Sequence, residues 1–130
     1  MIIQTKQINQ MTHSAKSVLV FGVYLTLVGA TLLIIPNLFL TVIGVANTSE
    51  VWIRLSGILL MALSVYYIVA AKHNLPVIFK VTVCIRCSII FFFSGFVYLQ
   101  MMEPVMLTFA AFDFLGGVWT YLAMKKEGSW

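Results

Sequence analysis

The sequence predicts an all-α fold, an integral membrane four-helix transmembrane bundle. Of its 130 residues, 62% are hydrophobic and 9% are charged, whereas ordinary soluble domains have about 45–50% apolar and about 25% charged residues. The mean hydropathy is +1.03. A soluble core of this size could not bury so much apolar surface, so the composition excludes a water-soluble globular domain. The length is that of one domain, and we expect residues 1–130 to form a single transmembrane domain.

Four apolar segments are long enough to cross the hydrocarbon core of a bilayer, which takes about 20 residues of helix. They are residues 17–35, 51–71, 81–102 and 105–124. None of them alternates with the period of two that is typical of a membrane barrel strand. We therefore expect four transmembrane helices.

The first span should end at Pro36, because the residue before a proline disfavours the helical conformation. Residues 38–46 are apolar but too short to cross, and we expect a turn or two of helix there, lying at the interface or dipping back into the membrane. Asn47, with Glu50 three residues later, has the spacing of a capping box and predicts the start of the second span.

Two further breaks separate the remaining spans. The run Asn74-Leu75-Pro76 predicts a turn between the second and third spans, and Glu103-Pro104 predicts one between the third and fourth. Proline is favoured at the first helical position, so we expect Pro104 to begin the fourth span.

The lysines all lie where the spans meet one side of the membrane, whereas the opposite connections contain Glu50 and Glu103. Cytoplasmic loops are enriched in lysine and arginine, so both termini are expected to be cytoplasmic. This distribution also explains the net charge of +4, and no nucleic-acid partner is expected. The lysines are Lys6, Lys16, Lys72, Lys80, Lys125 and Lys126.

Three ionisable side chains inside the spans are candidates for function, because such groups are costly in lipid and normally face partners inside a bundle. Asp113 is the only acid within a span, and by depth it falls between Arg54 and Arg86, about 9 Å along the axis from each. The sequence predicts a buried cluster of these three residues, with Glu50 balancing Arg54 at the membrane surface.

Three interpretations of this cluster remain open. It could fix the pairing of the helices without any ligand, form a polar binding pocket, or provide a proton or ion pathway. If it forms a pocket, Tyr67, Trp119 and Thr120 are further candidates for its lining.

Small and polar residues recur at helical spacing in three of the spans and predict close packing of helices within the bundle, or with a second copy of the chain. They are Gly22, Thr26 and Gly29; Arg54, Gly57, Met61 and Ser64; and Ala110, Asp113, Gly117 and Thr120, with Gly116 beside the last set.

Cys84 and Cys87 form a CxxC motif, which is typical of thiol redox chemistry. The pair lies near the predicted cytoplasmic side, which is reducing, and the chain has no other cysteine to pass electrons on. The two histidines, His13 and His73, have no acidic or cysteine neighbours, so no metal site is expected. No catalytic residue or cofactor is predicted either.

The order of these landmarks resembles a family of small bacterial membrane proteins with four transmembrane helices and unknown function, loosely similar to DoxX-like proteins. The resemblance implies the bacterial cytoplasmic (inner) membrane and includes both arginines and the aspartate, but neither cysteine. The matching residues are Pro36-Asn37, Ile43-Gly44, Glu50-Val51-Trp52-Ile53-Arg54, Gly57, Tyr66-Tyr67, Ala70-Ala71, Thr82-Val83, Arg86, Asp113, Gly116 and Trp119-Thr120.

The sequence favours a non-enzymatic role, namely binding of a lipophilic or amphipathic small molecule or assistance to a larger membrane complex. The alternative is a proton-coupled small-molecule transporter, expected to be dimeric because four spans offer little pathway alone, in which Asp113 would titrate. A membrane thiol or quinone oxidoreductase that uses Cys84 and Cys87 is the least favoured hypothesis.

Overall fold

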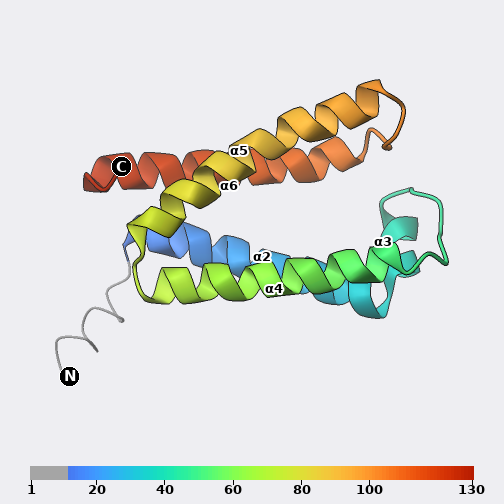
Figure 1. The fold of residues 1–130 in the computed structure, drawn as a ribbon, viewed down its shortest axis with the longest axis horizontal. Coiled ribbons are helices and arrows are strands. Elements are labelled where there is room, and N and C mark those ends of the chain that lie inside the picture. The colour runs from blue at the N-terminus through green and yellow to red at the C-terminus, as the bar shows by residue number, and fades with distance from the viewer. Residues whose placement is uncertain (1–11) are drawn as a thin grey trace.

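The computed structural model describes residues 12–130. This part of the chain is all-α, as predicted, and contains no strand. Its helices, in chain order, are α2 (His13–Ile34), α3 (Pro36–Val42), α4 (Trp52–Lys72), α5 (Pro76–Tyr98) and α6 (Met106–Glu127) (Figure 1). Lys6, which was predicted to precede the first span, lies outside the described residues.

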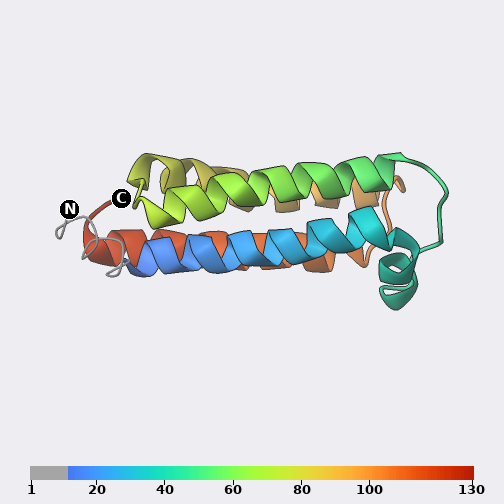
Figure 2. The ribbon, with the colours of Figure 1, turned by 90° about the horizontal axis from the view of Figure 1, so that it is seen from below.

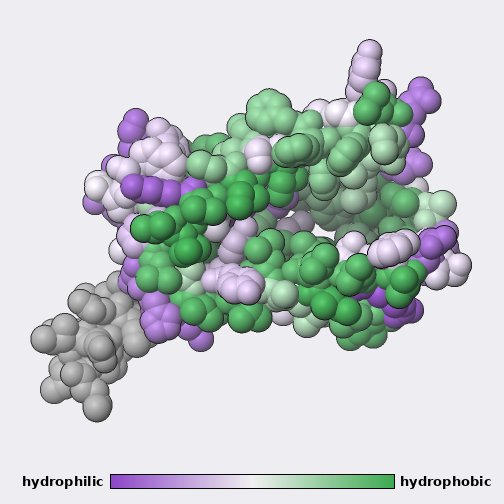
Figure 3. Space-filling model, viewed as in Figure 1, coloured by the Kyte–Doolittle hydropathy of each residue, from purple (hydrophilic) through white to green (hydrophobic). Residues whose placement is uncertain are grey.

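The four long helices are each able to cross a membrane. They contain 21 to 23 residues, with mean hydropathies from 1.3 to 2.3, and at about 1.5 Å per residue each matches a hydrocarbon core about 30 Å thick. Figure 3 shows mostly hydrophobic surface over the middle of one face, with hydrophilic residues gathered towards both ends. The chain is therefore a multi-pass membrane protein.

Consecutive long helices run in opposite directions (Figures 1 and 2). They form two pairs, α2 with α4 and α5 with α6. Helix α2 also contacts α6, which joins the two pairs. Helix α5 crosses obliquely and diverges from α4 towards the end where α3 lies (Figure 1). Residue Thr12 and the C-terminus lie at the opposite end, which we call the terminal end.

Close packing of α2 against α4 depends on two glycines, as the small-residue pattern predicts. A Cβ atom added at Gly57 would lie 2.6 Å from the backbone oxygen of Gly29, and one added at Gly29 would lie 2.8 Å from the backbone oxygen of Gly57. Nearer the terminal end, the Thr26 hydroxyl donates a hydrogen bond to Ser64 Oγ at 2.9 Å. Lipid provides no hydrophobic drive for helix association, so backbone approach and polar contacts hold this pair together.

The predicted capping box at Asn47 and Glu50 is wrong. Helix α4 begins later, at Trp52, and no side chain caps it. Asn47 Oδ1 instead accepts a hydrogen bond from the Thr41 hydroxyl at 3.0 Å, while the Glu50 backbone N–H donates to Thr48 Oγ1. Asn47 is thus held against α3 and is not available to cap α4.

Other boundaries also differ from the sequence-based ranges. Helix α2 begins at His13, four residues before the predicted start of the first span. Helix α6 begins at Met106, so Pro104 lies in the turn before the helix and not at its first position.

The short apolar helix begins earlier than predicted, since Pro36 occupies its first turn. The third span extends from Pro76 to Tyr98, five residues earlier at its start than predicted, because Pro76 suits the first helical turn and the chain reverses at Gln100, where φ is 60°. The predicted turn at Asn74 is confirmed, with a left-handed φ of 48°.

Replacing Gly57 by alanine is expected to destabilise the protein by about 1–3 kcal/mol, the usual cost of overpacking. The new Cβ would meet two backbone atoms, the Gly29 oxygen and the Leu33 nitrogen, neither of which can rotate away. Thermal unfolding in detergent measures the effect. Gly95→Ala on α5 is the matched control, since no atom lies within 4 Å of its added Cβ, and an equal loss in both variants would contradict the prediction.

Candidate functional site

Arg86 lies in the interior of the bundle, and only 1% of its surface is exposed. It follows the first residue of α5, Pro76, by ten residues, or about 15 Å of helix. Its Nη2 donates to Thr120 Oγ1 of α6 at 2.8 Å and to Thr82 Oγ1 at 3.4 Å, and its Nε donates to the Thr82 backbone oxygen at 3.4 Å. The guanidinium therefore links α5 to α6 through neutral oxygens.

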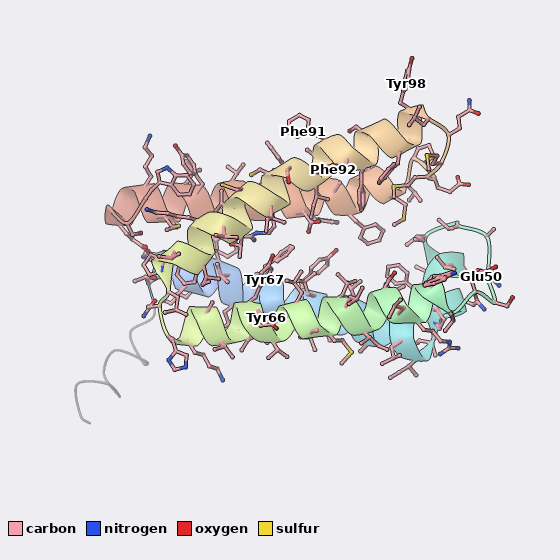
Figure 4. All side chains as sticks on the ribbon, in the orientation of Figure 1. Glu50, Tyr66, Tyr67, Phe91, Phe92 and Tyr98 are labelled. Carbon is pink, nitrogen blue, oxygen red and sulfur yellow. The ribbon has the colours of Figure 1, made fainter. Side chains whose placement is uncertain are left out.

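Two aromatic rings from the other helix pair complete the surroundings of Arg86. The guanidinium carbon lies 4.6 Å from the ring centre of Phe21 on α2 and 6.0 Å from that of Tyr67 on α4. Figure 4 shows Tyr67 on the side of α4 that faces the α5–α6 pair. Such cation–π contacts stabilise a desolvated guanidinium. We call Arg86, Thr82, Thr120, Phe21 and Tyr67 together the Arg86 centre, to which all four long helices contribute.

A line of hydrogen bonds connects this centre to the terminal end, which we call the α2–α6 seam. The hydroxyls of Thr120 and Ser17 lie 2.7 Å apart, and Ser17 Oγ donates to the Ser14 backbone oxygen. The Glu127 carboxylate then accepts from the Ser14 backbone N–H at 3.0 Å and from its hydroxyl at 2.7 Å. An acid at this position satisfies a first-turn N–H of α2 and interacts favourably with the helix dipole.

One nitrogen of Arg86 has no hydrogen-bond partner. Among residues 12–130, Nη1 is the one buried side-chain nitrogen or oxygen without such a partner. A Cβ added at Gly116 would lie 3.2 Å from Nη1 and 3.5 Å from the Phe21 ring. An unsatisfied buried donor typically costs about 1–3 kcal/mol, and more when it is charged. The Gly116 side of Arg86 is therefore where an additional acceptor would be most stabilising.

A pocket lies between α2 and α6, next to this nitrogen. Its volume is about 360 Å³, within the range of about 300–1,000 Å³ for small-molecule sites. Val20 and Leu115 in its wall are 55% and 62% exposed, so the pocket faces the bilayer. Phe21 and Gly116 belong both to the pocket wall and to the surroundings of Nη1. The lining consists of Ser17, Val20, Phe21, Tyr24, Phe112, Leu115, Gly116 and Trp119.

Several predicted site residues lie at this place. Arg86, Tyr67 and Thr120 belong to the Arg86 centre, and Trp119 lines the pocket. Asp113 is half-buried on α6, about one helical turn before Gly116. In the described residues Arg86 bonds to threonine oxygens and makes no ion pair with Asp113.

Arg54 and Glu50 lie elsewhere. The Arg54 guanidinium donates to the backbone oxygen of Leu33, one of the carbonyls left unpaired near the end of α2. Glu50 is exposed in the loop between α3 and α4 (Figure 4). The structure therefore does not join Arg54, Arg86 and Asp113 in one hydrogen-bonded cluster. The three residues were grouped by their depth in the membrane, which assumes that the spans are parallel. In the structure, α4 and α5 diverge towards the end where Arg54 lies.

Several residues of the Arg86 centre and the seam were missed by sequence reasoning. Ser17 and Phe21 lie four positions apart on one face of α2, and Ser14 precedes Ser17 by three, so the serines share that face as well. Paired serines in an otherwise apolar first span are a signal that could have been used. Nothing in the sequence distinguishes Phe21 from the other nine phenylalanines. Glu127 has the sequence context of an ordinary exposed acid near the C-terminus.

Both cysteines are free thiols. Cys84 is exposed on α5, while Cys87 Sγ packs 3.0 Å from the position that a Gly117 Cβ would take on α6. Within residues 12–130 no group of three histidine, cysteine or acidic side chains is placed to hold a metal ion. The packing of Cys87 against Gly117 lets α5 and α6 approach closely.

Comparisons of the chain with protein-family models, with curated proteins and with solved structures found no match.

Removing the Glu127 carboxylate is expected to destabilise the protein by about 1 kcal/mol, as the loss of a helix cap does. Glu127→Ala would leave the Ser14 N–H and hydroxyl without their acceptor. Glu103→Ala, which removes an exposed acid from the loop between α5 and α6, serves as the control. Detergent-based thermal unfolding of both variants measures the difference, and equal midpoints would contradict a structural role for the seam.

Proposed function

We propose that the protein binds a lipophilic or amphipathic small molecule in the pocket between α2 and α6. The observation that carries this proposal is the position of an unsatisfied, buried guanidinium nitrogen directly behind the pocket wall at Gly116 and Phe21. Binding sites for small molecules are typically apolar clefts with a few well-placed polar groups. This pocket is the apolar cleft, and the polar group is the guanidinium behind its wall.

The exposure of the pocket supports a ligand that arrives from the membrane. Val20, Leu115 and Trp119 are all partly exposed on the surface that faces lipid. A molecule dissolved in the bilayer would reach them without crossing water. The wall of the pocket is almost entirely apolar, because the one hydroxyl in it, that of Ser17, is buried and bonded to Ser14 and Thr120.

We also propose that the protein resides in a bacterial cytoplasmic membrane with both termini in the cytoplasm. Lys72, Lys125 and Lys126 lie in the last turns of α4 and α6 at the terminal end, whereas Glu50 and Glu103 lie in loops at the other end. Lysine enrichment on one side supports that side as cytoplasmic. The resemblance to small bacterial four-span proteins supports the bacterial membrane.

A pocket-filling substitution tests the proposed ligand site. Val20→Trp would place a large side chain in the pocket mouth, and Val23→Trp is the matched control because Val23 is similarly exposed on α2 but does not line the pocket. Native mass spectrometry of protein extracted in nanodiscs is expected to show a bound adduct on the wild type and on Val23→Trp, and loss of it on Val20→Trp. Identical spectra for all three proteins would refute the site.

The proposed orientation predicts that a C-terminal reporter active only in the cytoplasm will be active. The reason is the cluster of lysines at the terminal end, because positively charged segments next to a span tend to stay on the cytoplasmic side. The same reporter inserted in the loop between α5 and α6, next to Glu103, is expected to be inactive. The reverse pattern would overturn the orientation.

A further inference from the structure

We infer that the ligand of this pocket is an anionic lipophile, a single-chain carboxylate whose head group accepts hydrogen bonds from Arg86 Nη1. This inference rests on the proposed function and specifies the chemical class of its ligand.

The positive charge of Arg86 is the first reason to expect an anionic ligand. A cation removed from water is costly unless an opposite charge compensates it. All the groups in contact with this guanidinium are neutral, namely the hydroxyls and carbonyl of Thr82 and Thr120 and the rings of Phe21 and Tyr67. Asp113, the acid nearest along α6, is not among its partners. A carboxylate in the pocket would place an opposite charge in direct contact with the guanidinium.

The geometry around Nη1 is the second reason to expect an anionic ligand. A methyl group at Gly116 would lie 3.2 Å from this nitrogen and 3.5 Å from the Phe21 ring, so any side chain at this position would crowd the nitrogen. The absence of a side chain at Gly116 therefore leaves the approach open at that point. The Phe21 ring covers the guanidinium from the pocket side, and a rotation of this ring would admit the carboxylate.

The depth of Arg86 selects a small head group. About 15 Å of helix separates it from the start of α5 at the terminal end, which is well below the level of phospholipid head groups at the membrane surface. The carboxyl group of a single-chain acid is small enough to reach that depth through the lipid-facing mouth at Val20 and Leu115. Its chain would then lie against the apolar wall of the pocket.

Three probes with the same twelve-carbon chain test the inference on the wild-type protein in nanodiscs of zwitterionic lipid. They are dodecanoate, dodecanol and dodecyltrimethylammonium, measured at pH 9 so that the acid is ionised despite its apolar surroundings. Dodecanoate is expected to bind about tenfold or more tightly than dodecanol, as hydrogen bonds to charged groups contribute, and the ammonium probe is expected to bind most weakly.

Two variants locate the effect at Arg86. Gly116→Ala keeps the charge but occupies the approach to Nη1, so it is expected to abolish the preference for dodecanoate over dodecanol. Gly95→Ala, whose added methyl meets nothing within 4 Å, is expected to retain it. Arg86→Gln should also abolish the preference, and if that variant does not fold, the probe series and the Gly116 pair still decide the question.

The outcomes separate this inference from the proposed function. Equal affinity for dodecanoate and dodecanol, lost in Val20→Trp, would overturn the anionic ligand while leaving a lipophilic site. If no probe shows binding that is lost in Val20→Trp, both the anionic ligand and the lipophilic site would be overturned. Displacement of dodecanoate by added phosphatidylglycerol, again dependent on Val20, would show that the anion is a phospholipid head group and would overturn the single-chain assignment.

Discussion

The guanidinium of Arg86 must find acceptors inside a bundle surrounded by lipid, and this requirement organises the contacts between the helix pairs. Thr120 of α6 supplies the shortest hydrogen bond, and Ser17 of α2 bonds in turn to Thr120. Phe21 adds its ring from α2. Because α2 also packs along α4, the charge of one α5 residue holds the α5–α6 pair against the α2–α4 pair.

The two kinds of helix contact in this bundle use different physics. Helices α2 and α4 approach through Gly29 and Gly57, where only glycine leaves room for the facing backbone. Helices α2 and α6 instead meet through hydroxyls and the Glu127 carboxylate. Van der Waals packing and polar contacts replace the hydrophobic effect in lipid, which explains why a chain with so few polar side chains concentrates them at these interfaces.

The same interface also contains the pocket, and this coincidence links stability to the candidate function. Phe21 and Gly116 are contacts of the guanidinium and walls of the pocket. If protein groups accepted a hydrogen bond from every nitrogen of Arg86, the site would be purely structural. Instead Nη1 lacks a partner, and the remaining polar capacity lies on the pocket side. Helix α5 diverges from α4 beyond this point, so a ligand here would lie at an interface that joins the two helix pairs.

The all-α fold and its four spans followed from the sequence, because apolar length and helix-breaking residues such as Pro36 act locally. Arg86 was identifiable as well, since a charge within a span is costly wherever the helix packs. Its neighbours were not, because Thr120, Ser17 and Phe21 are ordinary residues whose proximity depends on how α2 and α6 pack. The predicted grouping of Arg54 with Asp113 and Arg86 needed parallel helices, and only the tertiary structure decided that α4 and α5 diverge and that Arg54 bonds to the end of α2.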